Sequence, residues 1–148
     1  MRRIICVGNR YLPEDANAFR VYENLLTREL PPGIEVIDGG LAGLNLLGLI
    51  EGAEKVVFVD TVLGTGTDEG ISVMESDEVA VLADQRFDHS SGLPYLLHMM
   101  PEVCQGVLPQ VIILGVEGVP DQQTIEKASS LALKIVMENI TGEEDFDD

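Results

Sequence analysis

Acidic side chains follow each of the four stretches of this sequence that are apolar enough to form buried strands. Glu14 and Asp15 follow the first stretch, Asp38 and Asp60 end the second and third, and Glu117 ends the fourth. Right-handed crossovers place the carboxyl ends of parallel strands along one edge of a sheet, so we expect these side chains to lie near one another. Close carboxylates repel unless a cation joins them, and the pattern therefore favours a metal ion or a basic peptide as ligand.

An acid at the end of a strand also has a simpler interpretation, because Asp side chains commonly cap turns there. For Asp38, which precedes two glycines, this structural role is the favoured interpretation. For Asp60 taken alone, the structural and functional interpretations are balanced. One or two such acids would be unremarkable, but acids after all four buried stretches favour a binding site.

The two histidines differ in their suitability as a nitrogen ligand. His98 lies among apolar residues of a predicted helix over residues 93–100, and we interpret it as a structural side chain, packed or partly exposed. His89 lies in a polar loop before that helix, where it is either solvated or joins the converging acids, and we favour the second. Two carboxylates and one imidazole make an open site suited to nickel, zinc or manganese.

Alternating strands and helices must position these residues. Predicted strands cover residues 3–8, 34–38, 55–60, 71–75 and 111–116. Predicted helices cover residues 19–30, 44–50 and 93–100, and a last segment that is capped by Asp121 and ends at Gly142. The apolar stripe of the first helix has three- and four-residue spacing and consists of Phe19, Tyr22, Leu25, Leu26 and Leu30. Gly39 and Gly40 are expected to force a turn after the second strand.

This order of elements predicts a three-layer α/β/α sandwich with a sheet of about five strands. The run from Val56 to Val59 is apolar on both faces, as in the middle of a parallel sheet covered by helices on each side. Residues 71–75 alternate in polarity and are expected to form one antiparallel edge strand. We predict a single domain over residues 1–142 and a disordered acidic tail over residues 143–148.

Composition narrows the classes of partner. The chain has 148 residues, with nine basic and 26 acidic side chains and a net charge of −17, which repels nucleic acid and anionic membranes. No apolar run is long enough to cross a bilayer, and no signal peptide is recognisable. Cys6 and Cys104 are expected to be free thiols. We therefore expect a cytoplasmic protein, and nothing in the pattern requires more than a monomer.

Several other chemistries lack their motifs in this sequence. There is no dinucleotide fingerprint after the first strand, no phosphate-binding loop, no nucleophile elbow and no His-Glu-x-x-His. Asp60-Thr61-Val62 lacks the glycine of the aspartic protease motif, and the residues around Cys104 do not support a nucleophilic thiol. A site for a metal ion or a basic peptide at the strand ends therefore stays the favoured interpretation.

Four short motifs, in the same order along the chain, resemble the hydrogenase maturation endopeptidase family. The resemblance extends to about residue 140, and the four motifs together are fairly specific. They are Gly8-Asn9 with an acidic pair six and seven residues after Gly8, Asp38-Gly39-Gly40, Val59-Asp60, and His89 before Gly92-Leu93-Pro94.

The resemblance implies an endopeptidase that removes a C-terminal extension from the precursor of a nickel–iron hydrogenase large subunit after nickel insertion. In that family an acid of the first loop, the acid of the central strand and the loop histidine coordinate a metal, which corresponds to Asp15, Asp60 and His89. Asp38 is a supporting residue. The nickel is delivered by the precursor, and zinc or cadmium can take its place in a crystal. A shared ion can polarise the peptide carbonyl or a water molecule as a Lewis acid.

One departure from the family pattern lies next to the predicted ligand. The family usually has glycines in the first loop, where this chain has Ala16-Asn17-Ala18. A left-handed turn at Asn17 would shift the register of Asp15 and make Glu14 a rival ligand. Two alternatives therefore stay open: a non-cleaving, chaperone-like protein that docks the precursor, and a metal-dependent hydrolase of small substrates.

Overall fold

The computed structural model describes residues 1–41, 43–62, 70–76, 93–104 and 106–138. Its strands are β1 (Arg2–Val7), β2 (Ile34–Gly40), β3 (Lys55–Val62), β4 (Ile71–Glu75) and β5 (Gln110–Glu117). Its α-helices are α1 (Asn17–Leu26), α2 (Leu47–Ile50), α4 (Leu93–Val103) and α5 (Gln122–Met137), and two 3₁₀ turns are η1 (Pro13–Asp15) and η2 (Leu44–Leu46). None of the described helices is both long and apolar enough to span a bilayer. The predicted tail over residues 143–148 and the predicted site residue His89 lie outside the described residues.

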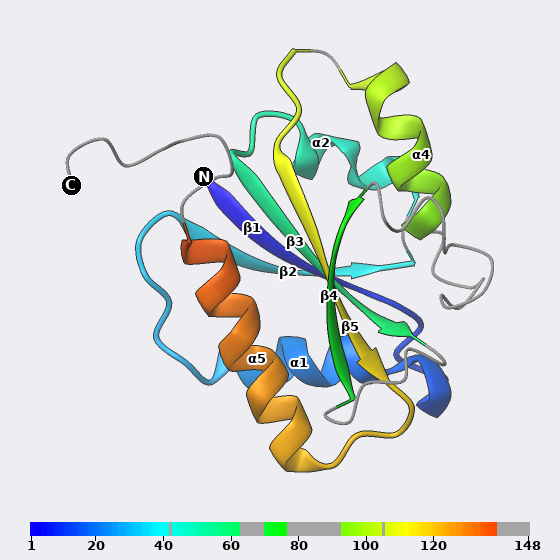
Figure 1. The fold of residues 1–148 in the computed structure, drawn as a ribbon, viewed down its shortest axis with the longest axis vertical. Helices are drawn as coiled ribbons and strands as arrows, with labels where there is room; N and C mark the ends of the chain where they lie inside the picture. The colour runs from blue at the N-terminus through cyan, green and yellow to red at the C-terminus, as the bar shows by residue number, and fades with distance from the viewer. Residues whose placement is uncertain (42, 63–69, 77–92, 105, 139–148) are drawn as a thin grey trace.

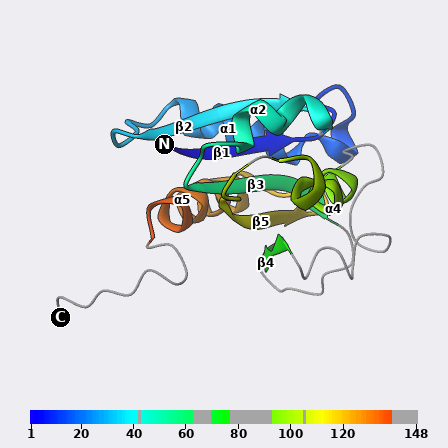
Figure 2. The ribbon, with the colours of Figure 1, turned by 90° about the horizontal axis from the view of Figure 1, so that it is seen from above.

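The described strands form a single sheet in the order β2-β1-β3-β5-β4 (Figure 1). Four strands are parallel, and β4 pairs antiparallel with β5 at the edge. Figure 2, which is turned by 90°, shows the strands stacked in this order. All eight residues of β3 are buried, as expected for a central strand covered on both faces. The predicted sheet, including its antiparallel edge, is confirmed.

Helices cover both faces of the sheet, and the sheet separates the core into two layers. The side chains of Ile5, Val7 and Phe58 pack with residues of α2 and α4 on one face. The alternate residues Ile4 and Cys6 pack with residues of α1 and α5 on the other. This alternation follows from the two-residue period of a strand and confirms the predicted three-layer sandwich. Cys6 and Cys104 are free, as predicted, and burial raises the pKa of the Cys6 thiol.

The first helix is shorter than predicted, and its apolar stripe is displaced by one residue. Its buried residues are Asn17, Ala18, Val21 and Leu25. Leu26 is 56% exposed, and Leu30 lies beyond the helix end. The helix ends at Leu26. The next residue, Thr27, is its C-cap, and the backbone N–H of Thr27 donates to the carbonyls of Asn24 and Leu25.

The last helix begins where predicted. The Asp121 carboxylate accepts a hydrogen bond of 2.8 Å from the Thr124 N–H, and this bond lowers the pKa of Asp121. The helix ends at Met137 rather than at Gly142. Basic side chains bind the carbonyls at this end: Arg2 donates to Val136 and Glu138, and Lys55 donates to Ile135 and Glu138. The predicted inner face is confirmed and comprises Ile125, Ala128, Ala132, Ile135 and Val136.

Candidate functional site

The order of the strands places a topological switch between β1 and β3. These neighbouring strands are parallel. The chain continues from β1 to β2 on one side of the switch, and from β3 through the edge strand β4 to β5 on the other. Ligands of open α/β sheets bind in the crevice beyond the carboxyl ends of such strands. Asp15 follows β1 and Asp60 lies on β3, so two of the predicted ligands flank this crevice.

Asp15 is held inside the edge of the sheet by the first turn of the chain. The turn η1 (Pro13–Asp15) contacts both β3 and the start of α1. The Asp15 side chain is completely buried, and its Oδ2 accepts a hydrogen bond of 2.7 Å from the Asn9 N–H. Glu14, the predicted rival, is exposed. The fold therefore places the Asp15 carboxylate, and not that of Glu14, at the buried position.

Gly8 makes this arrangement of the turn possible. Its φ of +139° is unfavourable for residues with a side chain. A Cβ atom at this position would lie 2.6 Å from the backbone oxygen of Asp15 and 3.2 Å from its Oδ1. Because a backbone atom cannot move away as a flexible side chain can, only glycine allows η1 to lie so close to the end of β1.

The segment Ala16-Asn17-Ala18 adopts an ordinary backbone conformation. The left-handed turn considered for Asn17 is wrong: no described residue other than glycine has a positive φ, and Asn17 is the first residue of α1. Its buried side-chain amide donates to the carbonyls of Val116, at 3.0 Å, and Gly118, at 2.8 Å. Asn17 thus joins the start of α1 to the carboxyl end of β5 and fixes the position of the residues that precede it.

The sequence predicted that Asp60 ends its strand, and this prediction is wrong. β3 continues to Val62 because β5 pairs with it as far as Glu117. Asp60 is completely buried, and its Oδ1 accepts a hydrogen bond of 2.8 Å from the Thr61 N–H. Because residues alternate along a strand, Asp60 shares a face with Phe58 and Val62, both of which belong to the core layer under α2 and α4.

Asp38 makes a local backbone contact of the kind a structural Asp makes, together with a contact to Arg10. Its Oδ1 accepts a hydrogen bond of 3.1 Å from the Gly40 N–H, and its Oδ2 lies 3.4 Å from the Arg10 guanidinium. The expected turn at Gly39 and Gly40 is wrong, because both residues continue β2 across an irregularity in its pairing with β1. Asp38 is therefore partly exposed beside the switch rather than buried in it.

The third predicted ligand, His89, cannot be placed relative to the two buried acids because it lies outside the described residues. The helix that follows it, α4, packs on the face of the sheet that Asp60 shares. Within the described part of the chain, no three His, Cys, Asp or Glu side chains form a group able to hold a metal ion. His98 is exposed on α4 and Glu117 is partly exposed at the end of β5. The predicted metal site therefore needs a ligand beyond Asp15 and Asp60.

An open groove of about 430 Å³ lies beside Asp15, at the ends of β1 and β2. Two of its side chains, Arg10 and Tyr11, belong to no motif recognised in the sequence. The Arg10 guanidinium lies 5.2 Å from the centroid of the Tyr11 ring and 5.1 Å from that of Phe19, so it is held between cation–π contacts and Asp38. Tyr11 is 79% exposed and Leu41 is 54% exposed. We call this the switch groove; its lining residues are Gly8, Asn9, Arg10, Tyr11, Asp38, Gly39, Gly40 and Leu41.

The chemistry of this edge suits a divalent cation and a peptide. Carboxylate oxygens are ligands that divalent cations take in proteins, and two buried carboxylates lie at or near the ends of neighbouring strands. The adjoining groove has three glycines in its wall, and glycines permit another backbone to approach closely. Exposed apolar and aromatic side chains on its rim offer contacts to the side chains of such a peptide.

Comparisons with known proteins point in the same direction. The model of the hydrogenase maturation protease family matches residues 19–141. Hydrogenase 2 maturation protease of Escherichia coli (strain K12) is 30% identical over 97 residues, which are 64% of this chain and 59% of that protein. The chain thus spans about three fifths of the length of this relative.

Two solved structures resemble the whole fold. The hydrogenase maturating endopeptidase HybD from E. coli is 26% identical, with a TM-score of 0.69 and coverage of 93% of this chain and 90% of that one. The solution structure of an endopeptidase from Escherichia coli is 27% identical, with a TM-score of 0.68 and the same coverage.

Proposed function

Because the chain belongs to the hydrogenase maturation protease family, we propose that it is an endopeptidase that removes a C-terminal extension from the precursor of a nickel–iron hydrogenase large subunit. The observation that carries this proposal is the position of Asp15 and Asp60. Both side chains are completely buried and flank the switch between β1 and β3. This is the edge at which an α/β sheet binds its ligand.

The metal belongs to the substrate in this proposal. Nickel already bound by the precursor would complete its coordination with Asp15, Asp60 and His89, a set of hard and borderline ligands that leaves positions for ligands of the precursor. Such an ion can polarise a peptide carbonyl or a water molecule. The chain's own contribution is to hold two carboxylates in fixed positions, so that the precursor is bound only when it carries the metal.

The switch groove would hold the peptide segment next to the bond that is cut. Its glycine-lined wall lies beside Asp15, and it opens between the ends of β1 and β2. Peptide backbone could lie against Gly39 and Gly40, while Tyr11 and Leu41 contact side chains of the precursor. The cytoplasmic location and the monomeric state expected from the sequence are part of the same proposal.

Incubation of the chain with nickel-loaded and nickel-free precursor tests this function. We expect mass spectrometry to detect a released C-terminal peptide with the nickel-loaded precursor alone. Cleavage of both forms would contradict recognition of nickel, although it would still show a peptidase. Cleavage of neither form, with tight binding of the loaded precursor, would instead favour the docking-only alternative.

The ordinary backbone around Asn17 favours the peptidase over that alternative. Replacement of the family glycines was the reason to doubt the position of Asp15, yet Asp15 is buried and held by the Asn9 N–H. A substitution of His89 by Ala gives a second test of the proposed ligand set. We expect this variant to lose cleavage of the loaded precursor while the wild-type chain retains it.

A further inference from the structure

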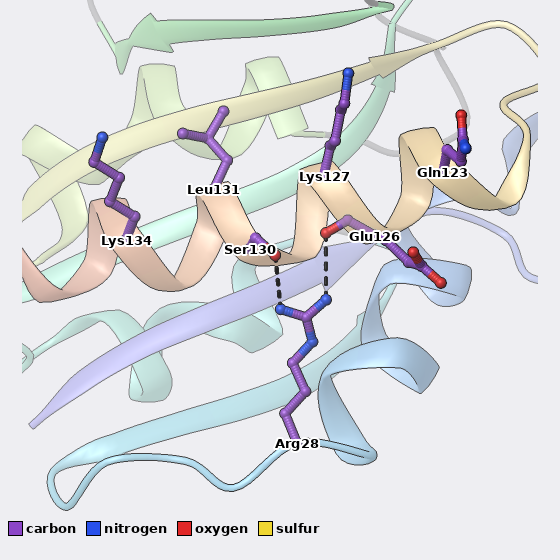
Figure 3. A pocket seen from close by; sticks show the side chains of 7 residues that line it. All are labelled: Arg28, Gln123, Glu126, Lys127, Ser130, Leu131 and Lys134. Atoms are coloured by element: carbon purple, nitrogen blue, oxygen red, sulfur yellow. Dashed lines mark hydrogen bonds between the residues drawn. The ribbon is translucent and has the colours of Figure 1, made fainter.

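A second groove, of about 650 Å³, lies between α5 and Arg28, which lies two residues beyond the end of α1 (Figure 3). It is on the α1 and α5 face of the sheet, whereas Asp60 lies on the opposite face. We call it the α5 groove. The side chains that matter here are Arg28, Glu126, Lys127, Ser130, Leu131 and Lys134.

The guanidinium of Arg28 is fixed against α5 by neutral acceptors. It donates to the Ser130 hydroxyl at 2.8 Å and to the Glu126 backbone carbonyl at 3.3 Å (Figure 3). It also donates to the Asn24 side-chain oxygen at 3.0 Å. These bonds hold the group in place without neutralising it. Arg28 therefore presents a positioned positive charge on one side of the α5 groove.

Two lysines supply positive charge on the other side. Lys127 and Lys134 are seven residues apart on α5, with Leu131 between them, so the three side chains share one helix face. In the described part of the chain, neither ammonium group has a carboxylate oxygen within 4.0 Å. Glu126 is the one acidic side chain in the lining, so the α5 groove has an excess of positive charge.

This excess is unusual for a chain with nine basic residues and a net charge of −17. Elsewhere in the described residues, Arg2, Arg3 and Arg10 each lie beside a carboxylate. Three of the nine basic side chains thus gather in one groove without such a partner. A second copy of this strongly acidic chain would be repelled over most of its surface, so the groove suits a short acidic segment.

We propose that the α5 groove binds the chain's own acidic C-terminal segment, residues 143–148. Five of these six residues are acidic, and the sixth is Phe146, so that acids flank one aromatic ring. The groove has the complementary arrangement, with cations on either side of Leu131. Opposite charges and one apolar contact therefore match between the groove and the segment.

The segment is attached at a suitable place and is long enough. α5 ends at Met137, and Lys127 lies roughly 17 Å back along the helix axis from residue 138. Ten residues follow residue 138 and span up to roughly 33 Å when extended. Since a short covalent link gives an effective concentration in the millimolar range, even weak charge pairing would favour the bound state.

Backbone amide NMR of the full-length chain tests this docking independently of any peptidase activity. One variant neutralises the segment by the substitutions E143Q, E144Q, D145N, D147N and D148N. At low salt, we expect its resonances to differ from those of the wild type at Arg28, Lys127, Ser130, Leu131 and Lys134. High salt should remove the differences, because it screens exposed charges.

A matched pair of variants separates specific docking from a general effect of charge. K134Q removes one positive charge from the α5 groove and should reduce the resonance differences between the acidic and the neutralised segment. V107E makes the same change in net charge at a residue that is 92% exposed and outside the groove. This variant should leave the resonance differences between the acidic and the neutralised segment unchanged.

Three outcomes would overturn the proposal. Equal effects of K134Q and V107E would show that the interaction is not local. Resonance differences that grow with protein concentration would assign the occupant to the segment of a second copy. If the resonances of the wild type and the neutralised variant do not differ at low salt, the segment does not bind the α5 groove, and an acidic segment of another protein becomes the candidate occupant.

Discussion

The buried pair Asp15 and Asp60 differs in its surroundings from Asp38, although all three acids lie at or near the ends of neighbouring strands. Asp15 and Asp60 are completely buried, and backbone N–H groups of adjacent residues or turns bind them. The Asp38 side chain is 28% exposed, and Arg10 lies beside it. Water and Arg10 compensate the charge of Asp38, whereas the fold keeps the other two charges out of water.

This difference separates two roles within one edge of the sheet. The buried pair lies at the edge where an open α/β sheet binds its ligand, so we interpret it as a ligand-binding pair rather than as turn caps. The Asp38 side chain accepts a local hydrogen bond from the Gly40 N–H, as a structural Asp would do. The following predictions test this separation, from the largest expected effect to the smallest.

Replacement of the buried carboxylates should have the largest effect. We expect Asp15→Asn and Asp60→Asn each to lower the rate of precursor cleavage by on the order of a hundredfold or more, because an amide is a weaker ligand for a divalent ion. The rate of peptide release, followed by mass spectrometry, measures the loss. Glu14→Gln is the matched control at the exposed neighbouring residue and should cleave normally. Loss of cleavage in the control with normal cleavage by Asp15→Asn would make Glu14 the ligand.

The position of Asp15, and not only its charge, should matter. In Gly8→Ala, the new Cβ atom would meet the backbone oxygen of Asp15 at 2.6 Å and displace the turn. We expect a loss of about 1–3 kcal/mol in the free energy of unfolding. We also expect a fall of roughly tenfold to a hundredfold in the cleavage rate, since small misplacements of site residues have large effects.

Gly52→Ala is the control for Gly8→Ala. Gly52 also has a positive φ, of 83°, but a Cβ atom there would have no neighbour within 4 Å. This variant should lose about 1–2 kcal/mol of stability through backbone strain and should cleave at the wild-type rate. Urea denaturation measures the stability of both variants. Equal cleavage by both would show that the contact between Gly8 and Asp15 is structural only.

Asn17→Ala tests how the buried pair is held by the rest of the fold. It removes two hydrogen bonds and leaves the Val116 carbonyl without this donor, so we expect a loss of about 1–3 kcal/mol in the free energy of unfolding. Asn24→Ala is the control on the same helix and should lose about 0.5 kcal/mol or less, because its side chain contacts a surface arginine. Similar losses in urea denaturation would contradict the anchoring role of Asn17.

Strand positions were predictable because they depend on local pattern. The continuous apolar run before Asp60 can be satisfied only between two helical layers, and β3 lies there. The alternation over residues 71–75 likewise predicted the edge strand β4. Asp121 predicted the start of α5, because the N-cap hydrogen bond joins residues that are only three apart in the sequence. In each case the physical reason lies within a few residues of the prediction.

The errors involve partners that are distant in sequence. The left-handed turn considered for Asn17 is wrong because its side chain bonds to the carbonyl of Val116, a contact across 99 residues that the sequence does not show. β3 passes Asp60 because β5 continues beside it. Gly39 continues β2 since its lack of a side chain lets it pass Ile5, where a Cβ atom would lie 2.8 Å from Cγ2. These contacts arise only when the sheet assembles.

The switch groove was also missed, because Arg10 and Tyr11 belong to no motif. Among the described residues, Arg10 contacts Asp38, Tyr11 and Phe19, which come from three different elements or loops. No spacing in the sequence brings these side chains together. The groove therefore forms only when the first loop folds over the end of β2.

Arg10→Ala should have the smallest effect and should sharpen the contrast between the groove and the buried pair. If the groove binds the precursor without taking part in the reaction, KM should rise about threefold to tenfold while kcat stays within about twofold of the wild type. Arg3→Ala is the control: Arg3 forms an ion pair with Glu35 outside the groove, and its loss should leave KM unchanged. A fall in kcat at constant KM would instead mean that Arg10, through Asp38, acts on the reacting groups. The exposed acid and the buried pair would then form one catalytic unit, and their difference in burial would not separate binding from chemistry.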